Sequence, residues 1–373
     1  MKILQVGKFF HPIEGGIEDY YYELSKELVK RGNIVSAFVS NTGKNDSHET
    51  VDGIHVYRFG ITSKIFNAPI SRPYFHLIRR INPDIIHLHC PNPLAEINIL
   101  LYKLLGGKAK VIVTYHSDVI PYTIILRTLN FIRSLYLLPL LKLFSSKVIA
   151  TSKNYISKSA ILQLVEDNVS VVPLFVDTDI FKPRTKRKSR KTTLLFAGRL
   201  VPYKGLQYLL DAIKKVSRRR PDIFLCIAGD GILRKELVAL AKNLGISNSV
   251  KFLGKVPTKR LLDLYDKCDI FILPSIFRSE AFGLAQLQAM SFGKPVISTD
   301  IPGSGVPFVN KNGETGLVVK PRNSLALSEV IIYLLDNQNI RKTFGVNARK
   351  RATKFFSKKT IVNQILSIYK NSR

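Results

Sequence analysis

Residues 192–229, TTLLFAGRLVPYKGLQYLLDAIKKVSRRRPDIFLCIAG, contain the pattern that decides the fold. Two apolar runs, 192–198 and 223–229, flank a stretch, 205–220, whose apolar residues recur at three- and four-residue spacing. Short runs rich in Val, Ile and Leu are typical of buried parallel strands, and the longer spacing is typical of a helix that covers a sheet with one face. We therefore predict a strand, a helix and a second, parallel strand.

The same alternation continues along the whole chain. Another amphipathic stretch is IEDYYYELSKELVKRG (17–32). The further strand-like runs are KILQV (2–6), IVSAFV (34–39), IHVYRF (54–59), DIIHLH (84–89), KVIVTY (110–115), KVIAT (147–151), VKFLG (250–254), DIFILP (269–274) and KPVIST (294–299). Alternation of this kind gives parallel sheets with helices on both faces. Because it occurs in both halves, we predict an α/β protein with two doubly wound, Rossmann-like domains.

A basic segment separates the two halves. KPRTKRKSRKT (182–192) holds seven basic residues, one proline and no apolar side chain, which is the composition of a linker. The 373 residues also exceed the roughly 250–300 at which single cores stop growing. We place the first domain at 1–180 and the second at 181–355. Their parallel sheets are expected to face each other across a cleft at the carboxyl ends of the strands.

The charge of the chain points to an anionic partner. The chain carries 57 Lys+Arg against 27 Asp+Glu, a formal net charge of +30, and 37 of the basic and 12 of the acidic residues lie in 181–373. Nucleic acid, anionic lipid headgroups and phosphorylated substrates all fit such a surplus. With 46% hydrophobic residues, the composition excludes a disordered or collagen-like chain.

The cysteines and the N-terminus favour a cytoplasmic protein. Cys90, Cys226 and Cys268 stand apart in apolar stretches and make neither a disulfide framework nor a zinc motif. Residues 1–10, MKILQVGKFF, fit a first strand, whereas a signal peptide needs a longer apolar region and a small-residue cleavage site.

The strongest candidate for a chemical site is RSEAFGLAQLQAMSFGKPVIS (278–298). We expect Ser279 to cap a helix that begins near Glu280 and runs past Gln288, which places these two side chains roughly 12 Å apart along the axis. A carboxylate at the helix start can accept hydrogen bonds from sugar hydroxyls, and the N–H groups of 282–284 can bind the same ligand. An ordinary amphipathic helix whose Glu stabilises its own N-terminus also fits this block.

Two loops that follow predicted strands carry further groups of interest. The loop R-L-V-P-Y-K-G contains Arg199 and Lys204, and two cations at a strand end can bind a diphosphate. The loop H-P-I-E-G-G-I contains Gly15 and Gly16, and glycine before a helix lets backbone N–H groups approach a phosphate or a sugar. A solvated basic loop and a tight turn are the simpler alternatives.

Taken in order, these pieces resemble the retaining glycosyltransferases of family 4, which have the two-domain GT-B fold. The resemblance covers nearly the whole chain, and the ordered set is specific although each piece is weak. The pieces are the Gly-Gly loop, TYHSD (114–118), VDTDIFKP (176–183), GRLVPYKG (198–205), IAGDG (227–231), VKFLGKVP (250–257) and the S-E-A-F-G block.

The resemblance implies a site for a nucleoside diphosphate sugar between the domains. In it Arg199 and Lys204 hold the diphosphate, Glu280 holds the donor sugar and His116 lies near the bond that breaks; these four are the catalytic candidates. It also implies that the last helix, 356–373, crosses back onto the first domain. No metal cofactor is expected, because the two cations take the part of a divalent ion. The donor-binding candidates are Gly15, Gly16, Arg199, Lys204, Gly229, Asp230, Gly231, Lys255, Val256, Pro257, Glu280, Ala281, Phe282, Gly283, Leu284 and Gln288.

The chain departs from the family pattern in two places. The family has a second Glu where this chain has Gln288, and Pro-Asn-Gly where this chain has Pro173, Leu174 and Phe175. We expect donor binding to survive, because an amide accepts a hydrogen bond from a ribose hydroxyl. No second carboxylate stands in a matching motif, so we expect a front-face mechanism in which the leaving phosphate helps to deprotonate the acceptor hydroxyl, rather than a double displacement.

Two other features carry alternatives. Segment 121–144 is very apolar but too often interrupted for the roughly 20 residues of a membrane span. It fits one or two buried helices, and it also fits an interfacial face that rests on a bilayer with Arg127 and Arg133 at the headgroups. Asp177-Thr178-Asp179 has the Asp-x-Asp pattern of a metal site, but the family match favours a structural role.

The remaining candidates for the cleft or the acceptor are His89 and Asp118. His87 and His89 alternate on a predicted strand, and we expect one of them to face the cleft and the other to face the opposite side of the sheet. His89 is the better candidate for the cleft, and histidines whose hydrogen bonds are satisfied at a strand end are the simpler alternative.

We therefore predict a hexosyltransferase that uses GDP-mannose or UDP-glucose. The run SGVPFVN (304–310) followed by GETGL resembles the subgroup that builds surface polysaccharides, whose acceptors are glycans or sugars on a polyprenyl phosphate. With segment 121–144 and the basic surplus, this predicts a peripheral protein on the anionic cytoplasmic face of the membrane. A glucan synthase of the glycogen or starch type, with a soluble acceptor, is the alternative. A nucleic-acid-binding protein is a distant one, because no recognition-helix, zinc-finger or RNP-like motif accompanies the charge.

Overall fold

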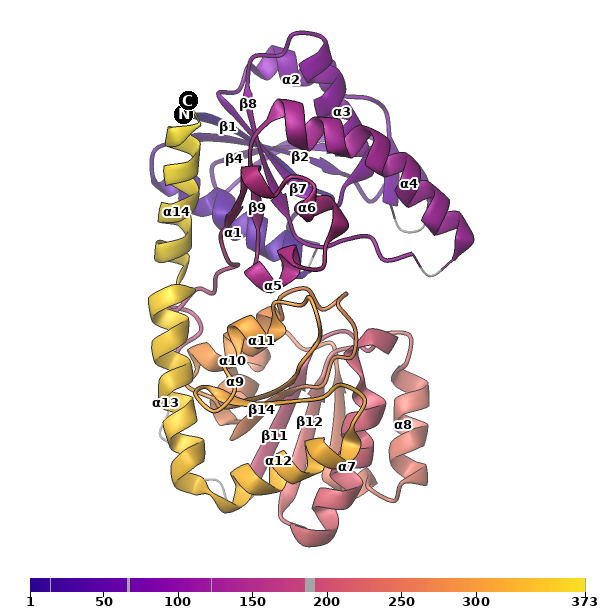
Figure 1. The fold of residues 1–373 in the computed structure, drawn as a ribbon, viewed down its shortest axis with the longest axis vertical. Helices are drawn as coiled ribbons and strands as arrows, with labels where there is room; N and C mark the ends of the chain where they lie inside the picture. Colours follow the sequence, from indigo (N-terminus) through magenta and orange to yellow (C-terminus); the bar gives the residue numbers. More distant parts are fainter. Residues whose placement is uncertain (14, 66–67, 122, 185–191, 373) are drawn as a thin grey trace. The chain divides into compact units, whose positions relative to one another are not determined.

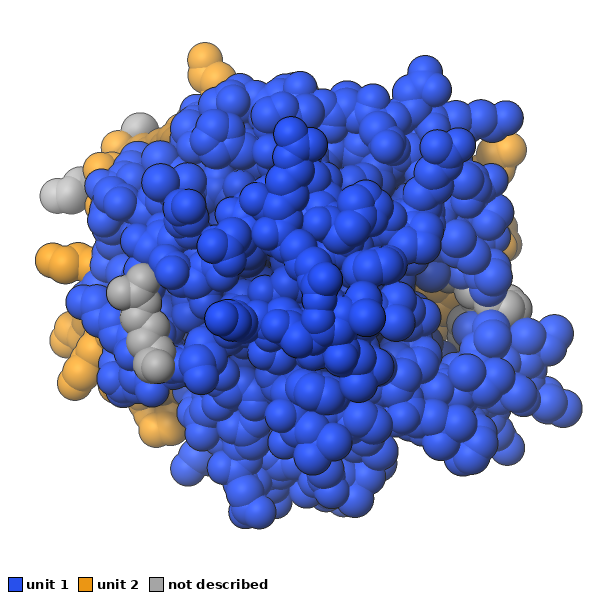
Figure 2. Space-filling view, turned by 90° about the horizontal axis from the view of Figure 1, so that it is seen from above, with its two compact units in different colours: residues 1–173, 361–373 blue, residues 174–360 orange. Residues whose placement is uncertain are grey.

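The computed structural model describes residues 1–373 except 14, 66–67, 122, 185–191 and 373. The chain divides into two compact units, which are coloured separately in Figure 2. Unit 1 comprises Met1–Pro173 and Ile361–Arg373, and unit 2 comprises Leu174–Thr360. Unit 2 thus begins earlier than the expected position 181, because Val176 pairs with Ser357 in an isolated bridge. Most of the predicted linker, 182–192, lies outside the described residues.

The sheet of unit 1 has eight strands in the order β10-β9-β8-β7-β1-β2-β4-β3. Neighbouring strands are parallel except for the antiparallel pair β3 and β4. The strands are β1 (Lys2–Val6), β2 (Ile34–Ser40), β3 (Ser47–Val51), β4 (Ile54–Phe59), β7 (Ile85–Cys90), β8 (Lys110–Tyr115), β9 (Ser145–Ala150) and β10 (Val169–Val171). A separate antiparallel pair consists of β5 (Ile61–Ile65) and β6 (Ala68–Ser71).

The middle of this sheet is buried on both faces. All six residues of β7 are buried, two histidines among them, because helices cover the sheet from both sides (Figure 1). Gln5 of β1 lies opposite His87 of β7, and His89 of β7 lies opposite Thr114 of β8. The helices of this unit are α1 (Gly16–Lys30), α2 (Phe75–Ile81), α3 (Pro93–Leu104), α4 (Ile124–Pro139), α5 (Lys153–Ile156), α6 (Ala160–Gln163) and the greater part of α14 (Lys358–Asn371).

The sheet of unit 2 has six strands, all parallel, in the order β13-β12-β11-β14-β15-β16. They are β11 (Thr192–Ala197), β12 (Ile223–Ala228), β13 (Val250–Gly254), β14 (Ile270–Leu273), β15 (Val296–Thr299) and β16 (Gly316–Val319). The helices are α7 (Leu206–Arg219), α8 (Arg234–Asn243), α9 (Thr258–Lys267), α10 (Leu284–Ser291), α11 (Val306–Val309), α12 (Ser324–Asp336) and α13 (Gln338–Phe355). The strand, helix and parallel strand predicted for 192–229 are β11, α7 and β12.

The strand order of unit 2 reverses beside β11. The chain continues from β11 to β12 on one side and returns to β14 on the other. In a doubly wound sheet, loops at such a switch point diverge at the carboxyl ends of the strands and leave a crevice for a ligand. The loops that carry Arg199 and Glu280 follow β11 and β14 and therefore flank the switch point.

Within segment 121–144, Ile124–Pro139 forms α4, which continues into a π-helical turn, Leu140–Phe144. Of the described helices, Ile124–Phe144 is the one long and apolar enough to cross a membrane by length and composition. Several large apolar side chains of this segment are exposed, Ile124 by 82%, Phe131 by 64% and Leu143 by 75%.

Arg133 does not stand at the surface of this segment. It is 7% exposed, and its guanidinium donates to both carboxylate oxygens of the fully buried Glu96 of α3, at 2.8 and 2.7 Å. The expectation that Arg133 reaches lipid headgroups is therefore wrong, because this side chain ties α4 to α3.

Candidate active site

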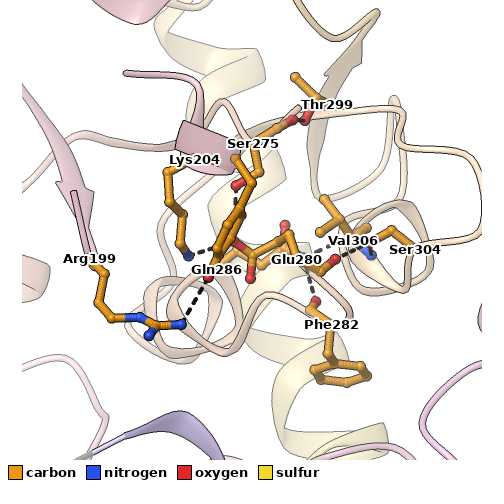
Figure 3. Close-up of polar contacts among 10 residues, drawn as sticks. Arg199, Lys204, Ser275, Glu280, Phe282, Gln286, Thr299, Ser304 and Val306 are labelled. Carbon is orange, nitrogen blue, oxygen red and sulfur yellow. Dashed lines mark hydrogen bonds and ion pairs between the residues drawn. The ribbon is translucent and has the colours of Figure 1, made fainter. Parts of the chain in front are cut away.

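Lys204 and Glu280 form a buried ion pair beside the switch point of unit 2 (Figure 3). Lys204 Nζ lies 2.5 Å from Glu280 Oε2, and each residue is 8% exposed. The same carboxylate oxygen accepts a hydrogen bond from Ser275 Oγ at 2.9 Å. Lys204 ends a short 3₁₀ turn, and Gly205 follows at φ +66, where a Cβ would lie 2.2 Å from the carbonyl oxygen of Pro274. Glycine at 205 thus lets the turn pack against the loop that follows β14.

The loop around Glu280 is not the start of a helix. The helix α10 begins at Leu284, its N-cap is Gly283 at φ +80, and none of the described side chains caps it. The expectation that Ser279 caps a helix from Glu280 is therefore wrong, and the predicted axial spacing to Gln288 does not apply. Instead, Ser304 Oγ donates to the carbonyl oxygen of Glu280, which holds the loop from outside the block.

The start of α10 carries backbone amides suited to an anion. Within the described chain, no hydrogen bond is formed by the N–H groups of Phe282, Gly283 and Leu284. Free amides at a helix N-terminus, together with the helix dipole, favour a negatively charged ligand. Ala281, the remaining member of the predicted block, accepts a hydrogen bond from Gly305 N through its carbonyl oxygen at 2.7 Å.

Two glutamines of α10 behave differently. Gln288 is half-buried, and its Oε1 accepts a hydrogen bond from the hydroxyl of Tyr265 at 2.9 Å. Gln286 is fully buried, and its Nε2 donates to the carbonyl oxygens of Phe282 and Val306 at 3.2 and 3.1 Å. Gln286 Oε1 is a buried acceptor without a partner among the described residues. The sequence analysis did not predict Gln286 as a site residue. Its position three residues after Gly283 was the one signal that could have indicated it.

Arg199 stands apart from the buried pair. Its side chain is exposed and, among the described residues, donates one hydrogen bond, to the hydroxyl of Tyr203 at 3.2 Å (Figure 3). With respect to this part of the chain, the other guanidinium nitrogens are available to a ligand, as binding of a phosphate requires.

The glycines after β12 serve packing against the Arg199 loop. A Cβ on Gly229, whose φ is +140, would lie 1.9 Å from the carbonyl oxygen of Gly198, and one on Gly231 would lie 2.4 Å from that of Leu200. Asp230 between them accepts from Gly231 N at 2.8 Å and from Arg234 at 3.0 Å. The Gly231 amide, with some help from Arg234, lowers the pKa of the Asp230 carboxyl. The structure thus joins this loop to that of Arg199.

Lys255, Val256 and Pro257 connect β13 to α9, for which Pro257 is the N-cap. Lys255 and Pro257 are exposed, and Val256 is half-buried. This turn lies at the same edge of the sheet as the loops after β11 and β12, because the three strands are parallel neighbours.

In unit 1, Gly15 and Gly16 precede and begin α1. Gly15 has extended backbone at φ −175, which any residue adopts, and Gly16 is exposed. A Cβ on Gly15 would lie 2.2 Å from a carboxylate oxygen of Glu18. Gly16 is thus open to solvent, whereas Gly15 leaves room for the Glu18 side chain although its backbone conformation does not require glycine.

His116 follows β8 and is only 3% exposed. Its Nε2 lies 3.0 Å from Nδ1 of His89, and Nε2 of His89 lies 2.8 Å from Oε1 of Gln5. Burial lowers the pKa of His116 to about 3, and burial together with the neighbouring histidines holds that of His89 well below the ordinary 6.5. Both imidazoles are therefore neutral at ordinary pH.

His87 and His89 lie on the same face of the sheet. Their ring centroids are 4.5 Å apart, because residues two apart on a strand point the same way. The expectation that they face opposite sides is therefore wrong. Asp118 is half-buried, and its Oδ1 accepts from Tyr115 at 2.8 Å and Ser159 at 2.7 Å, so that it fixes the loop after His116.

Comparison with known proteins identifies the family. Residues 14–180 match the family model Glycosyltransferase Family 4, and residues 177–351 match Glycosyl transferases group 1. The chain is 31% identical to D-rhamnosyltransferase WbpZ of Pseudomonas aeruginosa, over 96% of this chain and 92% of the relative. It is 29% identical to O-antigen chain mannosyltransferase C of Escherichia coli, over 99% and 98% of the two chains.

The chain belongs to the family 4 glycosyltransferases. It is an enzyme that transfers a sugar, which confirms the function class and the family expected from the ordered motifs.

Solved structures confirm the GT-B fold of this glycosyltransferase. Sucrose-phosphate synthase from Thermosynechococcus elongatus superimposes with a TM-score of 0.81 at 21% identity, over 99% of this chain and 98% of that chain. Anabaena HepE in complex with UDP-glucose superimposes with a TM-score of 0.77 at 20% identity, over the full length of both chains. These identities are too low to carry a substrate from one protein to another.

Asp177 of this glycosyltransferase has a structural place. Its Oδ1 accepts from the backbone amides of Asp179 and Ile180, and its carboxylate is paired with Lys358. Burial alone raises the pKa of Asp177, but the hydrogen bonds from Lys358 and the two amides outweigh it and lower the pKa overall. This pairing joins the start of unit 2 to the first residue of α14.

Proposed function

We propose that this glycosyltransferase is a retaining hexosyltransferase that uses a nucleoside diphosphate sugar. The observation that carries the proposal is the buried Lys204–Glu280 pair at the switch point, with the free amides of α10 and the exposed Arg199 beside it. Cations and amides suit a diphosphate, and a buried carboxylate held in place by Lys204 and Ser275 suits the hydroxyls of a sugar.

The reaction we propose takes place on one face of the sugar. The bond between the anomeric carbon and the diphosphate oxygen breaks, and the acceptor oxygen bonds to the same face of that carbon. The acceptor proton passes to the leaving phosphate, whose growing negative charge Arg199 and Lys204 stabilise. Gln288 binds the ribose in place of a glutamate, and no divalent ion takes part, so an excess of EDTA leaves the rate unchanged.

For the acceptor we propose a glycan or a saccharide on a polyprenyl lipid, at the cytoplasmic face of the membrane. The relatives named as an O-antigen chain mannosyltransferase and a D-rhamnosyltransferase support a glycan acceptor. The exposed apolar side chains of α4 and the net charge of +30 support a lipid surface with anionic headgroups. The α4 segment supplies the apolar contact, and the basic surplus supplies the attraction.

A donor screen tests the proposal. GDP-mannose, UDP-glucose and UDP-GlcNAc are compared by thermal shift, and the donor that raises the melting temperature is then offered with lipid-linked and soluble glycan acceptors. We expect one donor to stabilise the chain and the product to keep the donor's anomeric configuration. Inversion of configuration contradicts the front-face reaction, and a soluble glucan as the only acceptor points to a glucan synthase instead.

A further inference from the structure

A line of hydrogen-bonded side chains crosses the centre of unit 1 and ends at His116. Each of its members is at most 3% exposed. The line runs from His116 to His89, Gln5, Tyr369, His87 and Thr114, with successive distances of 3.0, 2.8, 3.3, 2.5 and 2.7 Å. The residues come from β1, β7, β8, the loop after β8 and α14, so the line is assembled only when α14 lies on the sheet.

The amide of Gln5 gives the line a direction. Gln5 Oε1 faces Nε2 of His89, and only a protonated Nε2 can donate to a carbonyl oxygen. A neutral His89 then has a bare Nδ1, so Nε2 of His116 must carry the proton that joins the two rings. On the other side Gln5 Nε2 donates to the Tyr369 hydroxyl.

The same direction continues beyond Gln5. The Tyr369 hydroxyl, having accepted from Gln5, donates its own proton to Nδ1 of His87. Nε2 of His87 then carries a proton and donates to Thr114 Oγ1. Every link has one donor and one acceptor, and all three imidazoles carry their proton on Nε2. A neutral line agrees with the burial, which lowers the pKa of His87 and of His116 to about 3.

The open end of the line is Nδ1 of His116. This nitrogen is buried and has no hydrogen-bond partner among the described residues. An unpaired buried polar atom costs free energy, which a ligand that supplies a hydrogen-bond donor recovers. The ring of Tyr20 packs edge-on against the imidazole of His116, with the ring centroids 5.6 Å apart.

We propose that this line fixes His116 as the tautomer with its proton on Nε2, so that Nδ1 accepts a hydrogen bond from a hydroxyl of a sugar substrate. A phosphate oxygen without a proton cannot supply that bond, so the nitrogen selects hydroxyl groups. The assignment of this hydroxyl to a sugar rests on the proposed function. The assignment of the His116 tautomer does not depend on it. Gln5 and Tyr369 are positioning residues, because they act on the substrate only through His89 and His116.

The tautomers are measured directly on the full chain without ligand. Histidine labelled with ¹⁵N distinguishes a protonated from a bare ring nitrogen in long-range ¹H–¹⁵N spectra, and single substitutions of the seven histidines assign the signals. We expect His87, His89 and His116 all to be protonated on Nε2 alone. A proton on Nδ1 of His116, as in a line that runs the opposite way, overturns the proposal.

The role of Tyr369 is tested by Tyr369→Phe, with Tyr102→Phe as the matched control. Both variants lose one buried hydroxyl of unit 1, but among the described residues the Tyr102 hydroxyl bonds only the backbone amide of Ala109, outside the line. Without the Tyr369 hydroxyl, Gln5 loses the partner that fixes its orientation. We expect His116 to populate both tautomers in Tyr369→Phe and to keep one in Tyr102→Phe. An unchanged His116 spectrum in a folded Tyr369→Phe protein overturns the coupling.

Activity provides the second measurement. With the donor found by thermal shift, we expect Tyr369→Phe to lower kcat/KM about fivefold and Tyr102→Phe to leave it unchanged, as the loss of one aligned hydrogen bond implies. Equal losses in both variants contradict the positioning role. If no donor is found, the proposed function fails while the spectra still decide the tautomer, so the two failures are distinguishable.

Discussion

At the scale of single residues, Lys204 and Glu280 depend on each other. Each is almost fully buried, and a buried charge without its partner is costly. The pair is therefore held in place before any ligand binds, which is how a site avoids paying for reorganisation during the reaction. Arg199 contributes differently, since it is exposed and has one hydrogen bond to the part of the chain that the structure describes.

We predict that Lys204→Ala, Glu280→Ala and Arg199→Ala each lower the rate of sugar transfer at least about tenfold, because each removes a charged contact to the donor. Lys259→Ala, which removes an exposed cation on α9 of the same unit, serves as the control and is expected to keep the wild-type rate. Initial rates at saturating acceptor give the comparison. Near-normal rates in the first three variants would contradict the donor site.

Gln288 and Tyr265 allow a finer test of the same site. We predict that Gln288→Glu keeps activity, because a carboxylate accepts the Tyr265 hydroxyl as the amide does. Gln288→Leu cannot accept it and is expected to raise the KM for the donor. Steady-state kinetics on both variants measure the KM for the donor. If the Glu variant were as impaired as the Leu variant, the amide N–H of Gln288 would be the group that binds the donor.

Arg133 and Glu96 are the second buried pair, and its role is in folding. We predict that Arg133→Met or Glu96→Leu alone destabilises unit 1 by about 3–5 kcal/mol, since each leaves a buried charge unpaired. The double variant is expected to be more stable than either single one. Urea unfolding measures all three, and Lys311→Ala, which breaks an exposed pair with Glu314, is the control with a loss below about 1 kcal/mol. A double variant as unstable as the sum of the singles would refute the coupling.

At the scale of elements, the sequence predicted the inner strands of both sheets, because a buried parallel strand is a continuous apolar run between polar ends. The short strands β3, β10 and β16, which lie at sheet edges, were not predicted. The start of α10 was misplaced for a physical reason. S-E-A-F-G reads locally as an N-cap and a first turn, but Glu280 is bound by Lys204 and Ser275, and Gly283 takes up a left-handed conformation. Contacts from distant parts of the chain outweighed local propensity there.

The line from His116 to Thr114 could not be predicted for the same reason. Tyr369 lies in the last helix, and nothing in its neighbours marks a partner in β1 or β7. Two histidines on a fully buried strand were the only local signal. Such residues need partners, but the sequence does not say where these are.

The exposed face of α4 gives a prediction about membranes. We expect the enzyme to bind vesicles that contain anionic lipid and to bind them less as salt rises, because the basic surplus is screened. A triple variant, Ile125→Ser, Phe131→Ser and Leu135→Ser, is expected to weaken binding at least about tenfold, since each side chain buries apolar area in the lipid.

The control for this experiment is Leu325→Ser with Val346→Ser, which removes comparably exposed apolar side chains from unit 2. We expect it to bind vesicles as the wild type does, as measured by co-sedimentation. Binding that depends on neither anionic lipid nor salt would contradict the electrostatic part, and equal losses in both sets would contradict the role of α4.

At the scale of the whole molecule, three buried histidines make stability depend on pH. Burial lowers the pKa of His87 and His116 to about 3 and holds that of His89 well below 6.5. In the unfolded chain they titrate near 6.5. Above pH 6.5 neither the folded nor the unfolded state binds these protons, so the histidines do not make the free energy of unfolding depend on pH. As the pH falls from about 6.5 towards 3, the unfolded chain takes up protons that the folded chain refuses, and stability is lost.

We therefore predict that the free energy of unfolding falls between pH 6.5 and 4, by up to about 1.4 kcal/mol per pH unit for each buried histidine. Urea unfolding at a series of pH values and high salt, which screens repulsion within a chain of charge +30, measures the slope. His87→Gln should reduce the slope by about one proton, because glutamine does not titrate and can still bond Tyr369 and Thr114. His76→Gln, which removes an exposed imidazole instead, is the control. A free energy of unfolding that stays constant from pH 6.5 to 4 would mean that the three imidazoles are charged in the folded protein. The donors and acceptors of the line through Gln5 could then not be arranged as described.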